Sequence, residues 1–263
     1  ESFFTKDKTF YRTLFPLLIT VALQNIVAYS VNMLDNIMLG SYSQNALSGA
    51  ATVNQIFFIV NQLALSIGNA LVAICSQYWG KQETGAIRKM TGVALALSVL
   101  IGAIVVTACT RIPEQLLRIF TTSPEIIAEG KAYLGLLKWT FLLFMISNLL
   151  IAMLRSVETV KISFVISVVS LITNGCINYT LIFGHFGFPQ LGVSGAAIGT
   201  VVSRVIEMSI NIIGGSRNLY LKDAIKMKKV PFDTTKEMLK RGLPLLCNEI
   251  LWSISIALIS QSY

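Results

Sequence analysis

Long uninterrupted apolar runs constrain this chain more than any other feature of its sequence. Several of them exceed the ~20 residues that an α-helix needs to cross the hydrocarbon core of a bilayer. Because lipid offers no hydrogen-bonding partner for the backbone, such runs must be helical. Only 13% of the residues are charged, against about 25% in an ordinary soluble domain. The sequence therefore predicts an all-α integral membrane protein, a polytopic helical bundle, rather than a soluble one.

Seven segments are long and apolar enough to span a membrane. They lie at residues 13–39, 46–78, 89–110, 126–154, 162–184, 193–215 and 238–263. Basic residues gather at the N-terminus, in the loops after the second and fourth segments, and after the sixth. By the positive-inside rule, this distribution predicts a multi-pass protein of the plasma (inner) membrane with a cytoplasmic N-terminus. The net charge of +8 then reflects topology, and we expect no nucleic-acid partner.

The beginnings of the first and last spans are similar. RTLFPLL at 12–18 and KRGLPLL at 240–246 both place a basic residue four positions before a proline that two leucines follow. Transporters are often built from two repeated halves, although basic residues and proline are also common at helix starts by chance. We therefore expect a first lobe at 1–215, a cytoplasmic linker at 216–237 and the first helix of a second lobe at 238–263, with the remainder of that lobe missing.

Polar residues recur on one face of three spans, at intervals of three, four, seven or eight residues. These sets are Gln24, Asn32 and Asp35 in the first span, Asn54, Asn61 and Asn69 in the second, and Ser163, Ser167, Ser170, Asn174 and Asn178 in the fifth. Residues at such intervals share a helix face. Stripes of this kind are too polar for lipid, so they either join helices or line a water-filled cavity.

The depth of three polar residues suggests a cluster. Asp35 lies near the outer end of the first span, Asn178 late in the outward-running fifth span, and Thr200 early in the inward-running sixth. With a rise of ~1.5 Å per residue, all three belong to the outer half of the bilayer. They can meet there if the first, fifth and sixth spans are neighbours.

Four stretches together resemble one transporter family. They are DNIMLGSYSQNALSGAA (35–51), SQYWGKQ (76–82), AMLRSVETVK (152–161) and NGCINYTLIFGHFGFPQLGVSGAAIGTVVSR (174–204). Their order and spacing are similar to those of the first lobe of multidrug and toxic compound extrusion (MATE) transporters. The resemblance implies two six-helix lobes around a central cavity that opens alternately to either side. It also implies efflux of amphipathic, mostly cationic compounds in exchange for H⁺ or Na⁺.

The same resemblance implies roles for individual residues. The acidic residue near the outer end of the first helix is central to ion coupling in this family, and Asp35 occupies that place. The cation site of some members implies Asn174, Asn178 and Thr200 as its further residues, and a possible Na⁺ site among the four. Asn178 departs from the pattern, because those members have Asp there. Glu249 is a weaker acidic candidate for the second lobe.

The remaining expectations concern the cavity and the class of protein. Candidates for lining the substrate cavity are Gln24, Tyr29, Asn32, Asn54, Asn61 and Asn148. Arg204 and Glu207 are three residues apart, which suits a structural ion pair. No phosphate-binding loop or nucleophile–base arrangement is present in the sequence, so we expect a monomeric transporter in the lipid bilayer, not an enzyme, with no cofactor besides its coupling ion. The alternative is a lipid-linked oligosaccharide flippase of the same superfamily, which the neutral and acidic stripes disfavour. A membrane enzyme or scaffold is a third reading.

Overall fold

The computed structural model describes residues 8–157 and 160–216, with a few helical residues between 233 and 255. Its elements are α1 (Lys8–Tyr42), α2 (Gln44–Gly80), α3 (Thr84–Arg111), α4 (Pro113–Arg118), α5 (Pro124–Ser156), α6 (Val160–Phe183), the 3₁₀ turn η1 (His185–Gly187) and α7 (Val193–Ser216). No strand occurs within these ranges. The all-α prediction is confirmed.

Six helices of the described part of the chain are long and apolar enough to cross a membrane. They cover 14–42, 44–80, 84–111, 124–156, 164–183 and 193–213, within a few residues of the first six predicted spans. The chain is therefore a multi-pass membrane protein. The predicted seventh span and the linker before it lie largely outside the described residues. The six-residue helix α4 was not predicted, because its residues are too few for a periodic pattern.

Local signals in the sequence explain where the helices begin and end. Ser43 caps α2 by accepting a hydrogen bond from the backbone N–H of Ala46, as expected for an N-cap serine. Proline stands in the first turn of α4 and of α5, where its missing N–H costs no helical hydrogen bond. Gly184 has a φ of 74°, which lets the chain turn sharply after α6. Short connections of this kind keep consecutive helices antiparallel.

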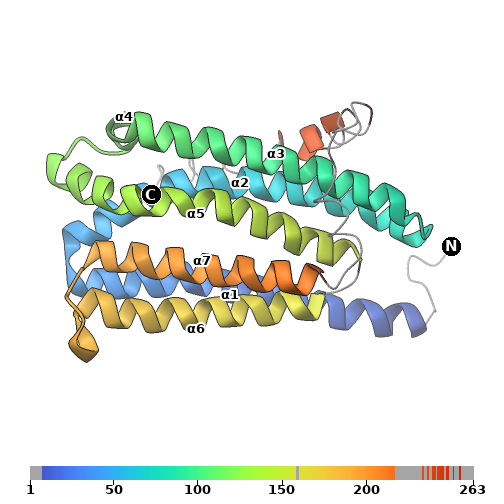
Figure 1. Ribbon diagram of the computed structural model, residues 1–263, viewed down its shortest axis with the longest axis horizontal. Helices are drawn as coiled ribbons and strands as arrows, with labels where there is room; N and C mark the ends of the chain where they lie inside the picture. Colours follow the sequence, from blue (N-terminus) through green and yellow to red (C-terminus); the bar gives the residue numbers. More distant parts are fainter. Residues whose placement is uncertain are drawn as a thin grey trace.

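The helices form two groups that run side by side (Figure 1). In one group, α5 packs against α2 and α3; in the other, α6 packs against α1 and α7. The contact between α5 and α7 joins the groups. Consequently α1, α6 and α7 are neighbours, as the predicted polar cluster requires.

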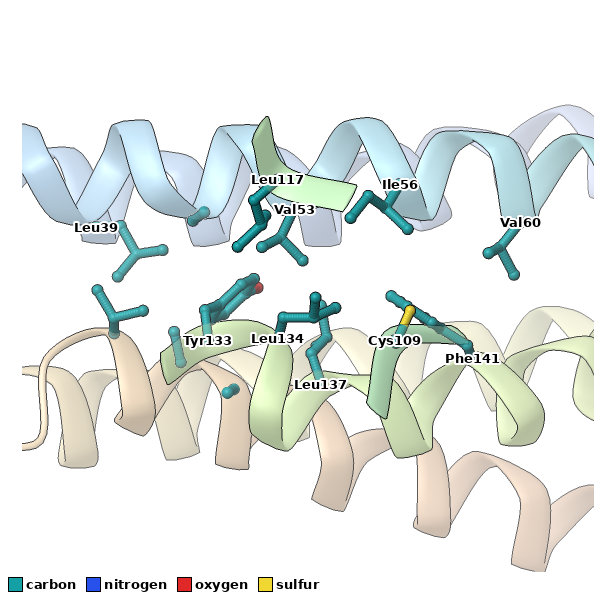
Figure 2. Packing of buried hydrophobic residues seen from close by; sticks show 14 of the residues in the cluster. Leu39, Val53, Ile56, Val60, Cys109, Leu117, Tyr133, Leu134, Leu137 and Phe141 are labelled. Atoms are coloured by element: carbon teal, nitrogen blue, oxygen red, sulfur yellow. The ribbon is translucent and has the colours of Figure 1, made fainter. Parts of the chain in front are cut away.

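Close packing holds α2 against α5. Figure 2 shows Val53, Ile56 and Val60 of α2 facing side chains of α5 that include Phe141, which is 0% exposed. Lipid tails are as apolar as these side chains, so van der Waals fit rather than exclusion from water favours the contact. Gly49 and Gly130 bring the two backbones together: a Cβ at Gly49 would lie 2.9 Å from the Gly130 nitrogen.

Candidate functional site

Asp35 is the centre of a polar cluster built by three helices. Its side chain on α1 is 6% exposed. On α6, Asn178 donates a hydrogen bond from Nδ2 to Asp35 Oδ1 at 2.5 Å. On α7, Thr200 Oγ1 lies 3.4 Å from the other carboxylate oxygen, Oδ2. The three residues whose depths matched in the sequence are thus in contact.

Asn174 completes the cluster. It lies one helical turn before Asn178 on α6, and its Oδ1 accepts a hydrogen bond from Asn178 Nδ2 at 3.2 Å. Its own Nδ2 donates to Thr200 Oγ1 at 3.3 Å. Asn174 and Asn178 are both 0% exposed. The four residues predicted as the ion-coupling site therefore form one connected hydrogen-bond network, while their role in coupling stays a prediction.

Glycine at two helix crossings makes this network possible. A Cβ at Gly199, the residue before Thr200, would overlap Asn178 Oδ1. A Cβ at Gly175 would lie 2.9 Å from Leu34 Cδ2 of α1. Small residues let helix backbones approach closely in a membrane. Here they bring α1, α6 and α7 near enough for short side chains to reach one another.

Among the described residues, the carboxylate of Asp35 has polar neighbours but no ion pair. Within the described ranges, the ion pairs are those of Glu114 with Arg118 and Lys131, and that of Glu207 with Arg204. A buried charge that is not paired is costly, so this carboxylate favours uptake of a cation or a proton. Carboxylate, amide and hydroxyl oxygens are ligands that hard cations accept. Asn178 Oδ1 is buried without a hydrogen-bond partner and packs against Gly199, whereas Nδ2 faces Asp35.

Tyr133 is a neighbour of this site that the sequence did not single out. It is 2% exposed on α5, and its side chain interacts with Thr200 and with the charge of Asp35. A small cavity of ≈ 20 Å³ lies among Asp35, Tyr133, Asn32 and Asn54. Tyr133 stands in the short apolar segment between Lys131 and Lys138 and belongs to none of the polar stripes, so only the spatial proximity of α5 and α7 reveals it.

A larger cavity of ≈ 120 Å³ contains most of the predicted lining residues. Its wall includes Gln24, Tyr29, Asn32, Asn61 and Asn148. Asn54, the sixth candidate, lines the small cavity instead, and Asn32 lines both. Whether these residues contact a substrate stays a prediction. Glu249 lies outside the described residues.

The larger cavity also contains charged residues, which changes its predicted character. Arg204 Nη1 and Glu207 Oε2 form the expected ion pair at 2.7 Å, and both residues line this cavity. Arg155 was placed in the loop after the fourth span, but α5 extends to Ser156 and Arg155 lines the cavity from its last turn. The Arg155 Nε is buried without a partner. Besides the neutral and acidic stripes, this cavity therefore contains two arginines and a glutamate.

Comparisons with curated proteins identify relatives in bacteria. The probable multidrug resistance protein NorM of Thermotoga maritima is 26% identical over 241 residues, which are 90% of this chain and 51% of that protein. The uncharacterized transporter YisQ of Bacillus subtilis is 27% identical over 259 residues, 95% of this chain and 54% of that protein. The chain thus spans about half the length of the curated relatives that it matches.

Solved structures share the fold. The Vibrio cholerae MATE transporter VcmN in its bent form matches with a TM-score of 0.85 at 14% identity, over 95% of this chain and 56% of that one. A crystal structure of MATE in the bent conformation matches with a TM-score of 0.84 at 18% identity, over 94% and 55% of the two chains. The family model MatE matches residues 20–180. With more than half of its length matched by that model, the chain belongs to the MatE family of multidrug and toxic compound extrusion transporters.

Proposed function

We propose that the full-length protein is a secondary active multidrug efflux antiporter. It exports amphipathic, mostly cationic compounds in exchange for H⁺ or Na⁺, by alternating access. The observation that carries this proposal is the buried carboxylate of Asp35, which Asn178 and Thr200 contact and which has no ion pair among the described residues. The names of the relatives, which are multidrug resistance proteins, support efflux.

The chemistry of the cluster suits an exchange of cations. Asp35 takes up the coupling ion, either as a proton on one carboxylate oxygen or as Na⁺ held by oxygens. Uptake neutralises a charge that low-dielectric surroundings disfavour. Asn174, Asn178 and Thr200 hold the carboxylate in place through the hydrogen-bond network, and each has a side-chain oxygen of the kind that hard cations accept. We place the protein in the plasma (inner) membrane as a monomer with a cytoplasmic N-terminus.

Transport by the full-length protein in liposomes tests the proposal. The liposomes are loaded with a fluorescent lipophilic cation, and a Na⁺ gradient and a pH gradient are imposed separately. Wild type is compared with Asp35→Asn and with Glu114→Gln, which removes an exposed carboxylate outside the cluster. We expect one gradient to drive export in wild type and Glu114→Gln, and Asp35→Asn to lose it. Export that persists in Asp35→Asn refutes the role of Asp35; no gradient-driven export in folded wild type refutes the antiporter.

One observation favours a second candidate, a lipid-linked oligosaccharide flippase. Arg155 and Arg204 both line the larger cavity, and guanidinium groups bind phosphate well. A flippase of this kind would lose transport of a fluorescent lipid-linked pyrophosphate in Arg155→Gln. An antiporter of organic cations would not transport that lipid, and its Arg155→Gln variant would still export organic cations.

A further inference from the structure

Arg204 stands between the two cavities. Its side chain lines both the small cavity at Asp35 and the larger cavity. In the structure it pairs with Glu207 at 2.7 Å, and the Arg204 side chain is 15% exposed. Its charge also acts on Asp35. One guanidinium is therefore within electrostatic reach of two buried carboxylates.

Glu207 Oε2 is held by α6 as well as by Arg204. Ser170 of α6 donates a hydrogen bond to Glu207 Oε2 at 3.2 Å, which ties the glutamate to the α6–α7 contact. Arg204 follows Thr200 by four residues and so lies on the same face of α7, one turn or ~6 Å along the axis. Because Thr200 contacts Asp35, a long arginine side chain that turns along α7 reaches the same carboxylate.

Two buried carboxylates, one at each cavity, lie near the single arginine that lines both cavities. Asp35 and Glu207 carry two negative charges, and the Arg204 that lies between them carries one positive charge. Arg155 of α5 lines the larger cavity but not the small cavity at Asp35, and it makes no ion pair within the described ranges. A buried charge that lacks a partner is costly. A bound cation is therefore favoured at whichever of the two carboxylates Arg204 is not contacting.

An aromatic ring makes the Glu207 end suitable for an organic cation. The Arg204 guanidinium lies 5.1 Å from the centroid of the Phe144 ring, a cation–π distance. If Arg204 moves to Asp35, a carboxylate and an aromatic face remain together in the larger cavity. This combination recognises quaternary ammonium and phosphonium groups, which Na⁺ and H⁺ do not resemble.

We propose that Glu207, with Phe144, is the site of this lobe that binds organic cations, and that Arg204 competes with them for it. When Asp35 holds its coupling ion, Arg204 pairs with Glu207 and excludes the organic cation. When Asp35 is empty, Arg204 pairs with Asp35, and Glu207 is open to the cargo. The two cations are then bound alternately, as exchange requires. This inference rests on the proposed antiport function and assigns its cargo site.

Binding of tetraphenylphosphonium to the purified full-length protein tests the inference. In wild type, we expect saturating coupling ion, Na⁺ or acid, to weaken binding. Glu207→Gln removes the carboxylate and weakens binding by roughly tenfold or more, the usual effect of losing a charged partner. Arg204→Gln removes the competitor, so binding becomes insensitive to the coupling ion. Arg204→Lys keeps the charge and retains the competition.

A double variant separates this inference from direct binding of the cargo at Asp35. Asp35→Asn mimics the neutral state, so Arg204 stays on Glu207 and tetraphenylphosphonium binding weakens. Adding Arg204→Gln to Asp35→Asn restores binding if Glu207 is the cargo site. If Asp35 itself holds the cargo, the double variant stays as weak as Asp35→Asn, and the inference is overturned. Wild-type affinity in Glu207→Gln overturns it as well.

A second variant is needed in case Arg204→Gln does not fold. Arg204→Gln leaves the Glu207 carboxylate without its ion-pair partner, and gel filtration detects a failure to fold. The neutral pair Arg204→Gln with Glu207→Gln then replaces it, and we expect this variant to fold and to bind tetraphenylphosphonium no better than Glu207→Gln. Wild-type affinity in the neutral pair overturns the inference. If wild type shows gradient-driven export and Asp35→Asn loses it, the antiporter is upheld even when the Glu207 variants behave as wild type. If wild type shows neither binding nor export, both the antiporter and the Glu207 cargo site are refuted.

Discussion

Replacing Gly199 with alanine tests whether the close crossing of α6 and α7 positions Asn178 against Asp35. A Cβ at Gly199 would overlap Asn178 Oδ1 and would lie 3.1 Å from its Cγ. The amide would have to turn away, and its hydrogen bond to the carboxylate would be lost. Overpacking costs about 1–3 kcal/mol, and a hydrogen bond to a charged group contributes about 1.5–3 kcal/mol. We therefore expect a destabilisation of at least ~2 kcal/mol.

Thermal unfolding of the purified protein in detergent measures this effect. With a shift of about 2–4 °C per kcal/mol, the Tm of Gly199→Ala should fall by about 4–8 °C. Gly135→Ala is the matched control, because a Cβ there meets no atom within 4 Å. Gly199→Ala is also measured in an Asn178→Ala background, which removes the obstructing amide. The reasoning fails if Gly199→Ala resembles the control, or if it costs as much when the amide is absent.

Three further predictions follow from packing and charge. Phe141→Ala should lower the free energy of unfolding by about 3–5 kcal/mol, because Phe141 is 0% exposed. Phe186→Ala is the control and should change this free energy little, because Phe186 is 84% exposed. Equal effects of the two substitutions in denaturation curves contradict the prediction. Glu114→Ala should change stability by less than ~1 kcal/mol, because its pair with Arg118 is exposed; a larger fall in Tm contradicts it. Asn178→Asp adds a second carboxylate beside Asp35, so Na⁺ should raise the Tm of this variant more than that of wild type, with choline as the control; no additional Na⁺ effect speaks against a cation site.

The membrane spans and the polar cluster at Asp35 could both be predicted from the sequence, but for different reasons. Apolar length alone locates helices, because the bilayer sets the number of residues required. Helical periodicity places Asn174 and Asn178 on one face of α6, and the rise per residue matches their depth to that of Asp35 and Thr200. That α1, α6 and α7 are neighbours does not follow from periodicity. The family resemblance implied it, and the packing of these helices in the structure provides it.

The residues that were missed lie where sequence patterns carry little information. Tyr133 belongs to none of the polar stripes, and its position against Asp35 depends on how α5 and α7 pack. Arg155 directly follows an apolar segment and begins a polar stretch that is typical of a loop. In the structure, α5 continues through Arg155 to Ser156. A signal for the charged part of the cavity was present: Thr200, Arg204, Glu207 and Asn211 recur on α7 at helical intervals. Interpreting Arg204 and Glu207 as a local pair hid their place on that shared face.

The glycine contact between α2 and α5 has a mechanical consequence. Packed helices usually shift by small changes in interlocking side chains, which permit sliding of an ångström or two. At Gly49 and Gly130 no side chain separates the two backbones, since a Cβ at Gly49 would lie 2.7 Å from the Glu129 Cβ and 2.9 Å from the Gly130 nitrogen. Sliding along either axis brings a neighbouring residue with a side chain into this gap. The crossing therefore acts as a fixed pivot: α2 and α5 can change their mutual angle here, but they translate together.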